Sequence, residues 1–223
     1  MHSKQFRALA LASALLAPVS LATAQSRAEG DLLDRAVAAW AKVKTARATF
    51  EQTITNPLTG RTLTASGEYQ QQRPGKLSVR FSDPANDRIV SDGTHLWLYL
   101  PSSTPGQVIR TPVKSAGSGT VDLSAQFLTA PRSRYTVTPA GTAQVSGRAT
   151  HAFALVPKQK EGAPFASATV WIDDADATVR QFEVTEPSGV RRRVRLTSLR
   201  PNAAVDASAF TFTVPEGVRV VER

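Results

Sequence analysis

Residues 63–81, LTASGEYQQQRPGKLSVRF, decide the fold class, because apolar side chains recur at alternate positions on both sides of an Arg-Pro-Gly turn. After the turn, Leu77, Val79 and Phe81 alternate with polar or charged residues. A repeat of two places alternate side chains on one face of a β-strand. The stretch therefore predicts two strands, each with an apolar face, joined at residues 73–75.

The same repeat continues through most of the chain, in short segments separated by Gly, Pro, Asn and Asp residues. The predicted strands are residues 46–54, 63–69, 77–81, 88–91, 95–100, 134–138, 143–156, 166–172, 178–185, 190–198 and 210–214. Residues 102–120 are rich in Ser, Pro, Gly and Thr, and we expect a loop there with at most one edge strand near residues 108–110. About ten or eleven short strands indicate a mainly β (α+β) fold, whose antiparallel sheet curls on itself.

Two helices are expected. Residues 29–44, EGDLLDRAVAAWAKVK, carry apolar side chains at the spacing of an amphipathic helix, with acidic residues early and Lys late. Residues 121–129 predict a short second helix whose apolar side consists of Leu123, Phe127 and Leu128.

Residues 1–24 have the pattern of a secretory signal peptide. Lys4 and Arg7 precede an apolar run, and Ala22-Thr23-Ala24 has the small residues of a cleavage site. Cleavage would leave residues 25–223 as a single, exported, soluble domain. It would remove two cations and lower the formal charge from +9 to +7.

The chain offers few groups for covalent chemistry. It contains no Cys, and the mature part would keep only His95 and His151, so thiol nucleophiles, catalytic triads and His-rich metal sites are disfavoured. Asp173, Asp174 and Asp176 lack the spacing of a calcium loop and are predicted to form a solvated turn. No glycine-rich phosphate loop is present. We therefore predict a protein that is not an enzyme and has no cofactor and no metal.

A basic run, residues 191–195, is the strongest charge feature. On a strand, Arg191, Arg193 and Arg195 would form a row of guanidinium groups on one face. A solvated sheet face is one interpretation, and docking to an acidic partner or anionic head groups is the other. No aromatic side chains are interleaved with the cations, so nucleic acid is not expected as a partner.

The order of these features resembles the family of periplasmic outer-membrane lipoprotein carriers, LolA, across nearly the whole mature chain. The matching pieces are the predicted first helix, 48–52 (ATFEQ), 66–69 (SGEY) before Arg73-Pro74, 89–93 (IVSDG), 96–99 (LWLY), 204–207 (AVDA) and 210–218 (FTFTVPEGV). Each piece alone is weak, whereas all of them in one order are specific.

The resemblance implies an incomplete antiparallel β-barrel with an α-helical lid over an apolar cavity for lipoprotein acyl chains. Combined with the apolar pattern, it favours a lining of Trp40, Phe50, Ile54, Leu77, Val79, Phe81, Trp97, Tyr99 and Phe127. In residues 95–100 both sets of alternate side chains are apolar, so the pattern does not decide which set faces inward. We place Trp97 and Tyr99 inward. By resemblance, Arg73 is the residue that hydrogen-bonds lid carbonyls and holds the lid closed.

The resemblance also implies partners. The cargo would be acylated lipoproteins, released by an inner-membrane ABC transporter complex and delivered to an outer-membrane receptor by a periplasmic monomer. Two alternatives stay open at this point. One is a carrier or sensor of another lipid on the same scaffold, and the other is a regulatory interaction module without lipid cargo.

Overall fold

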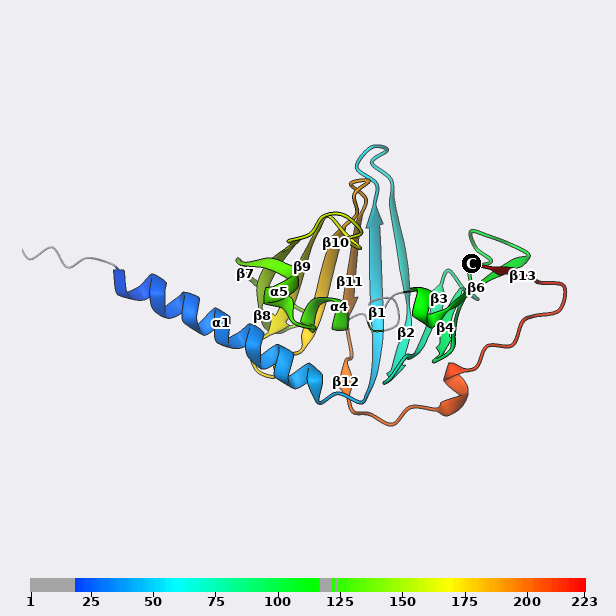
Figure 1. Cartoon of the computed structure of the whole chain (residues 1–223), viewed down its shortest axis with the longest axis horizontal. Helices are drawn as coiled ribbons and strands as arrows, with labels where there is room; N and C mark the ends of the chain where they lie inside the picture. Colours follow the sequence, from blue (N-terminus) through cyan, green and yellow to red (C-terminus); the bar gives the residue numbers. More distant parts are fainter. Residues whose placement is uncertain (1–18, 117–121, 123) are drawn as a thin grey trace, which may run out of the picture.

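The computed structural model describes residues 19–116, 122 and 124–223, and one curved, open sheet dominates it (Figure 1). The sheet has 13 strands in the order β13-β6-β5-β4-β3-β2-β1-β11-β10-β9-β8-β7, with β12 paired to β1. Neighbouring strands are antiparallel except for β13 and β6, which are parallel. The strands are β1 (Thr45–Thr55), β2 (Thr62–Gln72), β3 (Lys76–Asp83), β4 (Arg88–Asp92), β5 (His95–Tyr99), β6 (Gln107–Pro112), β7 (Tyr135–Val145), β8 (Arg148–Pro157), β9 (Ser167–Asp173), β10 (Val179–Thr185), β11 (Arg191–Leu196), β12 (Arg200–Pro201) and β13 (Arg219–Glu222).

The predicted mainly β, antiparallel fold is confirmed, with 13 strands in the described residues rather than ten or eleven. One difference lies at residues 143–156, which we predicted as a single strand. The chain reverses at Ser146 and Gly147, whose φ angles of 50° and 76° are those of a two-residue hairpin turn. Gly141 lies between the predicted strands 134–138 and 143–156, but the structure places it within β7 where the register shifts, so a β-bulge accommodates it.

The C-terminal segment also differs from its prediction. Residues 210–214 do not join the sheet; a 3₁₀ helix, η1 (Ala207–Phe210), is followed by extended chain that leads to β13. Phe210 is buried. The segment packs beside β3 and β4 through η1, and it ends by adding a parallel edge strand to β6. The alternation at residues 210–214 therefore reflects packing onto a sheet face rather than strand pairing.

The first helix, α1 (Val19–Ala41), begins earlier and ends earlier than predicted. Leu32, Leu33 and Ala36 are buried against the sheet, as the amphipathic pattern predicted. Its N-terminal end projects away from the sheet (Figure 1). Most of the predicted signal peptide lies outside the described residues, so its cleavage stays a prediction. None of the helices in the described part of the chain is long and apolar enough to cross a membrane.

Among the described residues, three further α-helices are short: α2 (Val113–Ala116), α4 (Ala125–Leu128) and α5 (Pro131–Arg134). The predicted loop 102–120 contributes β6 and α2, and its last residues lie outside the described part of the chain, as does Leu123. Phe127 and Leu128 are buried, as the predicted apolar side of this helix requires. The helices α1 and α4 are in contact with each other and share the hydrophobic core with the sheet.

Gly67 lies where β2 and β3 leave no room for a side chain. A Cβ atom at this position would lie 2.2 Å from the carbonyl oxygen of Arg80 on β3. The register of β2 against β3 shifts next to Gly67, between Ser66 and Gly67. The glycine therefore allows β3 to bend over β2, which gives the sheet part of its curvature.

Candidate functional site

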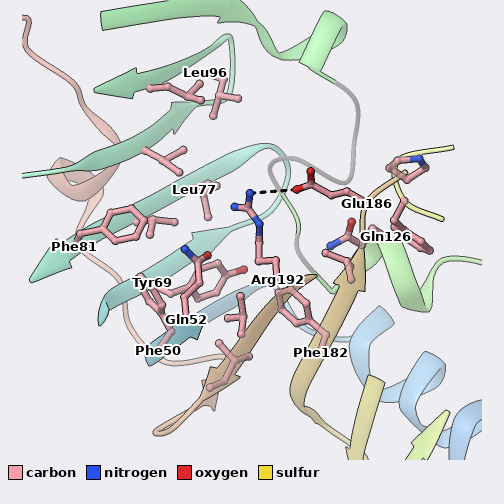
Figure 2. Close-up of a pocket in the computed structure, with 18 of the residues that line it drawn as sticks. Phe50, Gln52, Tyr69, Leu77, Phe81, Leu96, Gln126, Phe182, Glu186 and Arg192 are labelled. Carbon is pink, nitrogen blue, oxygen red and sulfur yellow. Dashed lines mark ion pairs between the residues drawn. The ribbon is translucent and has the colours of Figure 1, made fainter. Parts of the chain in front are cut away.

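The curved sheet encloses a cavity of about 760 Å³ (Figure 2). Its walls come from the inner faces of β1 to β5, from β10 and β11, and from α4 and residues 162–165 on the other side. The apolar lining residues are Phe50, Tyr69, Leu77, Val79, Phe81, Ile89, Leu96, Leu98, Pro164, Phe165, Phe182, Val184, Pro187, Val194 and Leu196. Pockets that hold small molecules span roughly 300–1,000 Å³ and have mostly apolar walls, so this cavity has the size and chemistry of a binding site.

Four of the nine predicted lining residues line the cavity: Phe50, Leu77, Val79 and Phe81. They come from β1 and β3, where the strict alternation of the sequence predicted one apolar face. Phe50 and Phe81 form an edge-to-face pair with ring centroids 5.4 Å apart. Three of the four, Leu77, Val79 and Phe81, belong to residues 63–81, so this stretch forms much of one wall of the cavity.

The prediction for Trp97 and Tyr99 is wrong. Both rings lie on the opposite face of β5, where they contact Phe212 at centroid distances of 5.4 and 5.8 Å. Leu96 and Leu98 line the cavity instead. The C-terminal segment covers the outer face of β5, so both faces of this strand are apolar and alternation alone does not identify the inner one.

The remaining three predicted residues also lie outside the lining. Phe127 is fully buried, and its ring packs against Phe165 and Phe182, which themselves line the cavity. Trp40 packs against the core at the end of α1. Ile54 lies on β1 opposite Arg192, beyond the apolar part of the wall. The sequence patterns predicted that these three side chains face inward. Whether an inward side chain lines the cavity or packs behind its wall depends on tertiary packing.

Sequence reasoning missed the wall that β10 and β11 provide. Phe182 and Val184 on β10 and Val194 and Leu196 on β11 line the cavity. Phe182 is paired in register with Val194. Apolar side chains alternate with polar ones in both strands, so the sequence does indicate an apolar inner face. The basic residues of β11 drew attention to its outer face instead.

Arg73 joins three parts of the chain at the turn between β2 and β3. Its Nη1 donates hydrogen bonds to the carbonyl oxygens of Trp40 and Val43 at 2.9 and 3.2 Å. Its Nε donates to the Asp122 carboxylate at 2.8 Å. The guanidinium also lies over the Trp40 ring, 4.4 Å from its centroid. Arg73 thus binds the end of α1 and the segment before α4, and both ion-pair partners are mostly buried.

Two polar side chains of β2 lie buried close to Arg73. The Tyr69 hydroxyl donates to Oε1 of Gln71, and both side chains are almost fully buried. Burial raises the pKa of the Tyr69 hydroxyl far above its usual range, and the nearby Asp122 carboxylate adds to this effect. The hydroxyl therefore stays neutral near pH 7 and donates a hydrogen bond to Gln71.

The row of Arg191, Arg193 and Arg195 lies along the outer face of β11, but its members are not all free. Arg193 lies 2.7 Å from the carboxylate of Glu183, and Arg195 pairs with Glu51. The neighbouring strands β10 and β1 supply these carboxylates in register. Arg191 is exposed at the start of the strand. Docking through this row stays a prediction.

We predicted that Asp173 belongs to a solvated turn, and this is wrong. Asp173 is buried at the end of β9. Arg148 and Arg180 donate to its Oδ2 at 2.6 and 2.9 Å. Burial acts to raise the pKa of Asp173, but these hydrogen bonds and one from the Ala175 N–H outweigh it and lower the pKa to about 2. In the described part of the chain, no group of three or more His, Cys, Asp or Glu side chains is placed to hold a metal ion.

The fold and the cavity define a binding protein, in which an open antiparallel sheet and short helices surround an apolar space. Residues 41–213 match the model of the family described as outer membrane lipoprotein carrier protein LolA, and the chain belongs to this family. It is a family of carriers rather than enzymes.

Similar proteins cover nearly the whole chain. An outer-membrane lipoprotein carrier protein of Methylibium petroleiphilum is 31% identical over 209 residues, which are 91% of this chain and 95% of that protein. A protein of the same name from Cronobacter sakazakii is 30% identical over 213 residues, 95% of this chain and 96% of that protein. Among solved structures, an uncharacterized conserved protein from Thermus thermophilus has a TM-score of 0.53 at 13% identity, with coverage of 87% of this chain and 99% of that one.

Proposed function

We propose that this protein binds the acyl chains of lipoproteins in its cavity and carries them through the periplasm. In this proposal it receives lipoproteins from an inner-membrane ABC transporter complex and delivers them to an outer-membrane receptor. The observation that carries the proposal is the apolar cavity of about 760 Å³ in a chain that belongs to the LolA family.

Elementary energetics explain why acyl cargo needs such a cavity. Each buried methylene contributes about 0.8 kcal/mol, so one chain of ~16 carbons resists transfer to water by roughly 12 kcal/mol. A carrier must therefore surround the chain with apolar side chains. The inner faces of β3, β5 and β11 supply them, and Leu77, Leu96 and Leu196 are among the most buried.

Arg73 is proposed as the latch that holds α1 and α4 over the sheet. Its support is the set of hydrogen bonds to two carbonyl groups of the α1 end and to Asp122. Hydrogen bonds to charged groups contribute about 1.5–3 kcal/mol each. Three such bonds amount to about 5–9 kcal/mol at most, which is less than the roughly 12 kcal/mol from burial of one acyl chain, so cargo entry can break the latch.

Mass spectrometry of the protein purified from periplasm without detergent tests the proposal. Co-purifying triacylated lipoprotein supports it. Another lipid in the cavity would favour a carrier of that lipid, and an empty protein in repeated preparations would favour an interaction module.

A variant that fills the cavity makes the test specific. Val79→Trp places a large ring in the wall, and we expect it to abolish lipoprotein retention while the protein stays folded. Val156→Trp is the matched control, because Val156 is exposed on β8. Equal retention in both variants would place the cargo outside the cavity.

A further inference from the structure

The cavity wall changes from apolar to charged along β10 and β11. The inward residues of β10 are Phe182 and Val184, and Glu186 follows them; those of β11, read towards the same end, are Leu196, Val194 and Arg192. The two series run side by side, because Val184 is paired with Arg192. Figure 2 shows Arg192 reaching across towards Glu186 among the lining residues.

Exposure increases in the same direction. Phe182 and Leu196 are 4% and 5% exposed, whereas the side chains of Glu186 and Arg192 are 38% and 43% exposed. The charged end is therefore the open end of the cavity. It lies far from Arg73, since Arg192 is opposite Ile54 near the end of β1 and the α1 end precedes the start of that strand. Nine residues of β-strand separate the two ends by roughly 30 Å.

The charged groups of the lining carry a net positive charge. They are Arg134, Arg192 and Glu186, and the amides of Gln52 and Gln126 are the neutral polar groups beside them. Arg192 and Glu186 are held loosely, with 3.6 Å between Nη2 and Oε1. Arg193, the next residue on the outer face, lies only 2.7 Å from Glu183. The loose pair leaves Arg192 able to bind a second anion.

We propose that Arg192, assisted by Arg134, binds the anionic head group of an acyl amphiphile whose chain fills the apolar end of the cavity. The group is a phosphate or a carboxylate, because a guanidinium donates two parallel hydrogen bonds to either. Arg134 faces the same space from α5, where its guanidinium donates to the carbonyl of Gln126 and lies over the Tyr135 ring. The inference rests on the acyl-binding cavity proposed above. It adds anionic amphiphiles as a second class of ligand for that cavity, because the acylated cysteine of a lipoprotein carries neither a phosphate nor a carboxylate.

Competitive displacement of a fluorescent fatty acid tests this with three ligands of one chain length: hexadecyl phosphate, palmitate and hexadecanol, each below its aggregation limit. We expect the two anions to bind about tenfold more tightly than the alcohol, which corresponds to ~1.4 kcal/mol. Inorganic phosphate alone, without a chain, is expected to displace nothing. If only one of the two anions is preferred, that result identifies the head group as phosphate or carboxylate.

Three variants test which residues cause the preference for anions over the alcohol. Arg192→Gln is expected to remove most of the tenfold preference and to leave hexadecanol binding unchanged. Glu186→Gln is expected to strengthen anion binding severalfold, because it removes the competing carboxylate. Arg193→Gln, on the opposite face of the same strand, is the control and should change nothing.

Equal binding of the alcohol and both anions to the unmodified protein would overturn the inference, as would equal effects of Arg192→Gln and Arg193→Gln. Failure of the acyl-binding cavity gives a different result, because then hexadecanol would not bind either, whereas failure of lipoprotein carriage alone would appear as absent lipoprotein in the purified protein. Thermal unfolding of each variant confirms that the fold is retained.

Discussion

The guanidinium of Arg73 lies 2.8 Å from the carboxylate of Asp122, which is 49 positions later in the chain. The same guanidinium donates to the two carbonyl groups of Trp40 and Val43 at the end of α1. One side chain in a turn between two strands therefore fixes both helical segments that cover the sheet.

Arg73→Leu is expected to lower the free energy of unfolding by about 3 kcal/mol or more, because it removes three charge-assisted hydrogen bonds and leaves the mostly buried Asp122 carboxylate unpaired. Amide hydrogen exchange should accelerate at the end of α1 and in α4. Arg193→Leu, which removes an exposed pair, serves as the control and should have a small effect. Unchanged exchange in both helices would contradict a latch at Arg73.

The two faces of β5 are expected to respond differently to polar substitution. Leu98 lines the cavity, so Leu98→Asn should weaken binding of a fluorescent fatty acid about tenfold through loss of apolar contact. Tyr99 contacts Phe212 on the other face, so Tyr99→Asn should reduce stability and leave ligand affinity unchanged. Ligand titration and urea unfolding of both variants separate the two effects. The reverse result would mean that the aromatic face is the inner one.

Gly67→Ala is expected to destabilise the protein by about 2 kcal/mol or more, since the new methyl group would collide with the Arg80 carbonyl and force the strands apart. Gly30→Ala is the matched control. Its new Cβ would lie 3.7 Å from the nearest atom, Nη2 of Arg132, within a helix that favours alanine. In urea unfolding, Gly67→Ala should therefore lower the midpoint clearly, whereas Gly30→Ala should change it little or raise it. Similar urea midpoints for the two variants would show that β2 and β3 have room to separate at Gly67.

Asp173 should make stability depend on pH in the acid range. Its pKa in the folded state is about 2, below the ordinary value of 3.8, so its contribution is complete above about pH 4 and is lost as the pH falls towards 2. The loss should be about 2 kcal/mol. Asp173→Asn should lower stability at pH 7 and flatten the pH dependence between 4 and 2. Parallel acid titrations of both proteins by circular dichroism provide the measurement.

Period-two alternation predicted the antiparallel sheet and the apolar faces of Phe50, Leu77, Val79 and Phe81, and the family resemblance added that these faces line a cavity. These residues lie on strands whose other face is polar, so the pattern identified the inner side. The same method failed at Trp97 and Tyr99, because the C-terminal segment covers that face and makes both sides of β5 apolar. It also missed the β7–β8 turn at Ser146 and Gly147, and it predicted a strand break near Gly141, where the structure has a β-bulge within β7.

The sequence by itself determined most of the strands, the amphipathic first helix and the family, because each depends on residues close together in the chain or on their order. Only the tertiary structure decided how deep each inward side chain lies, which cations are already paired, and where the cavity opens. Those properties arise from residues far apart in sequence, as when Arg195 meets Glu51 or Arg73 meets Asp122. Local periodicity carries no information about such distant neighbours, so it cannot distinguish a cavity wall from the core behind it.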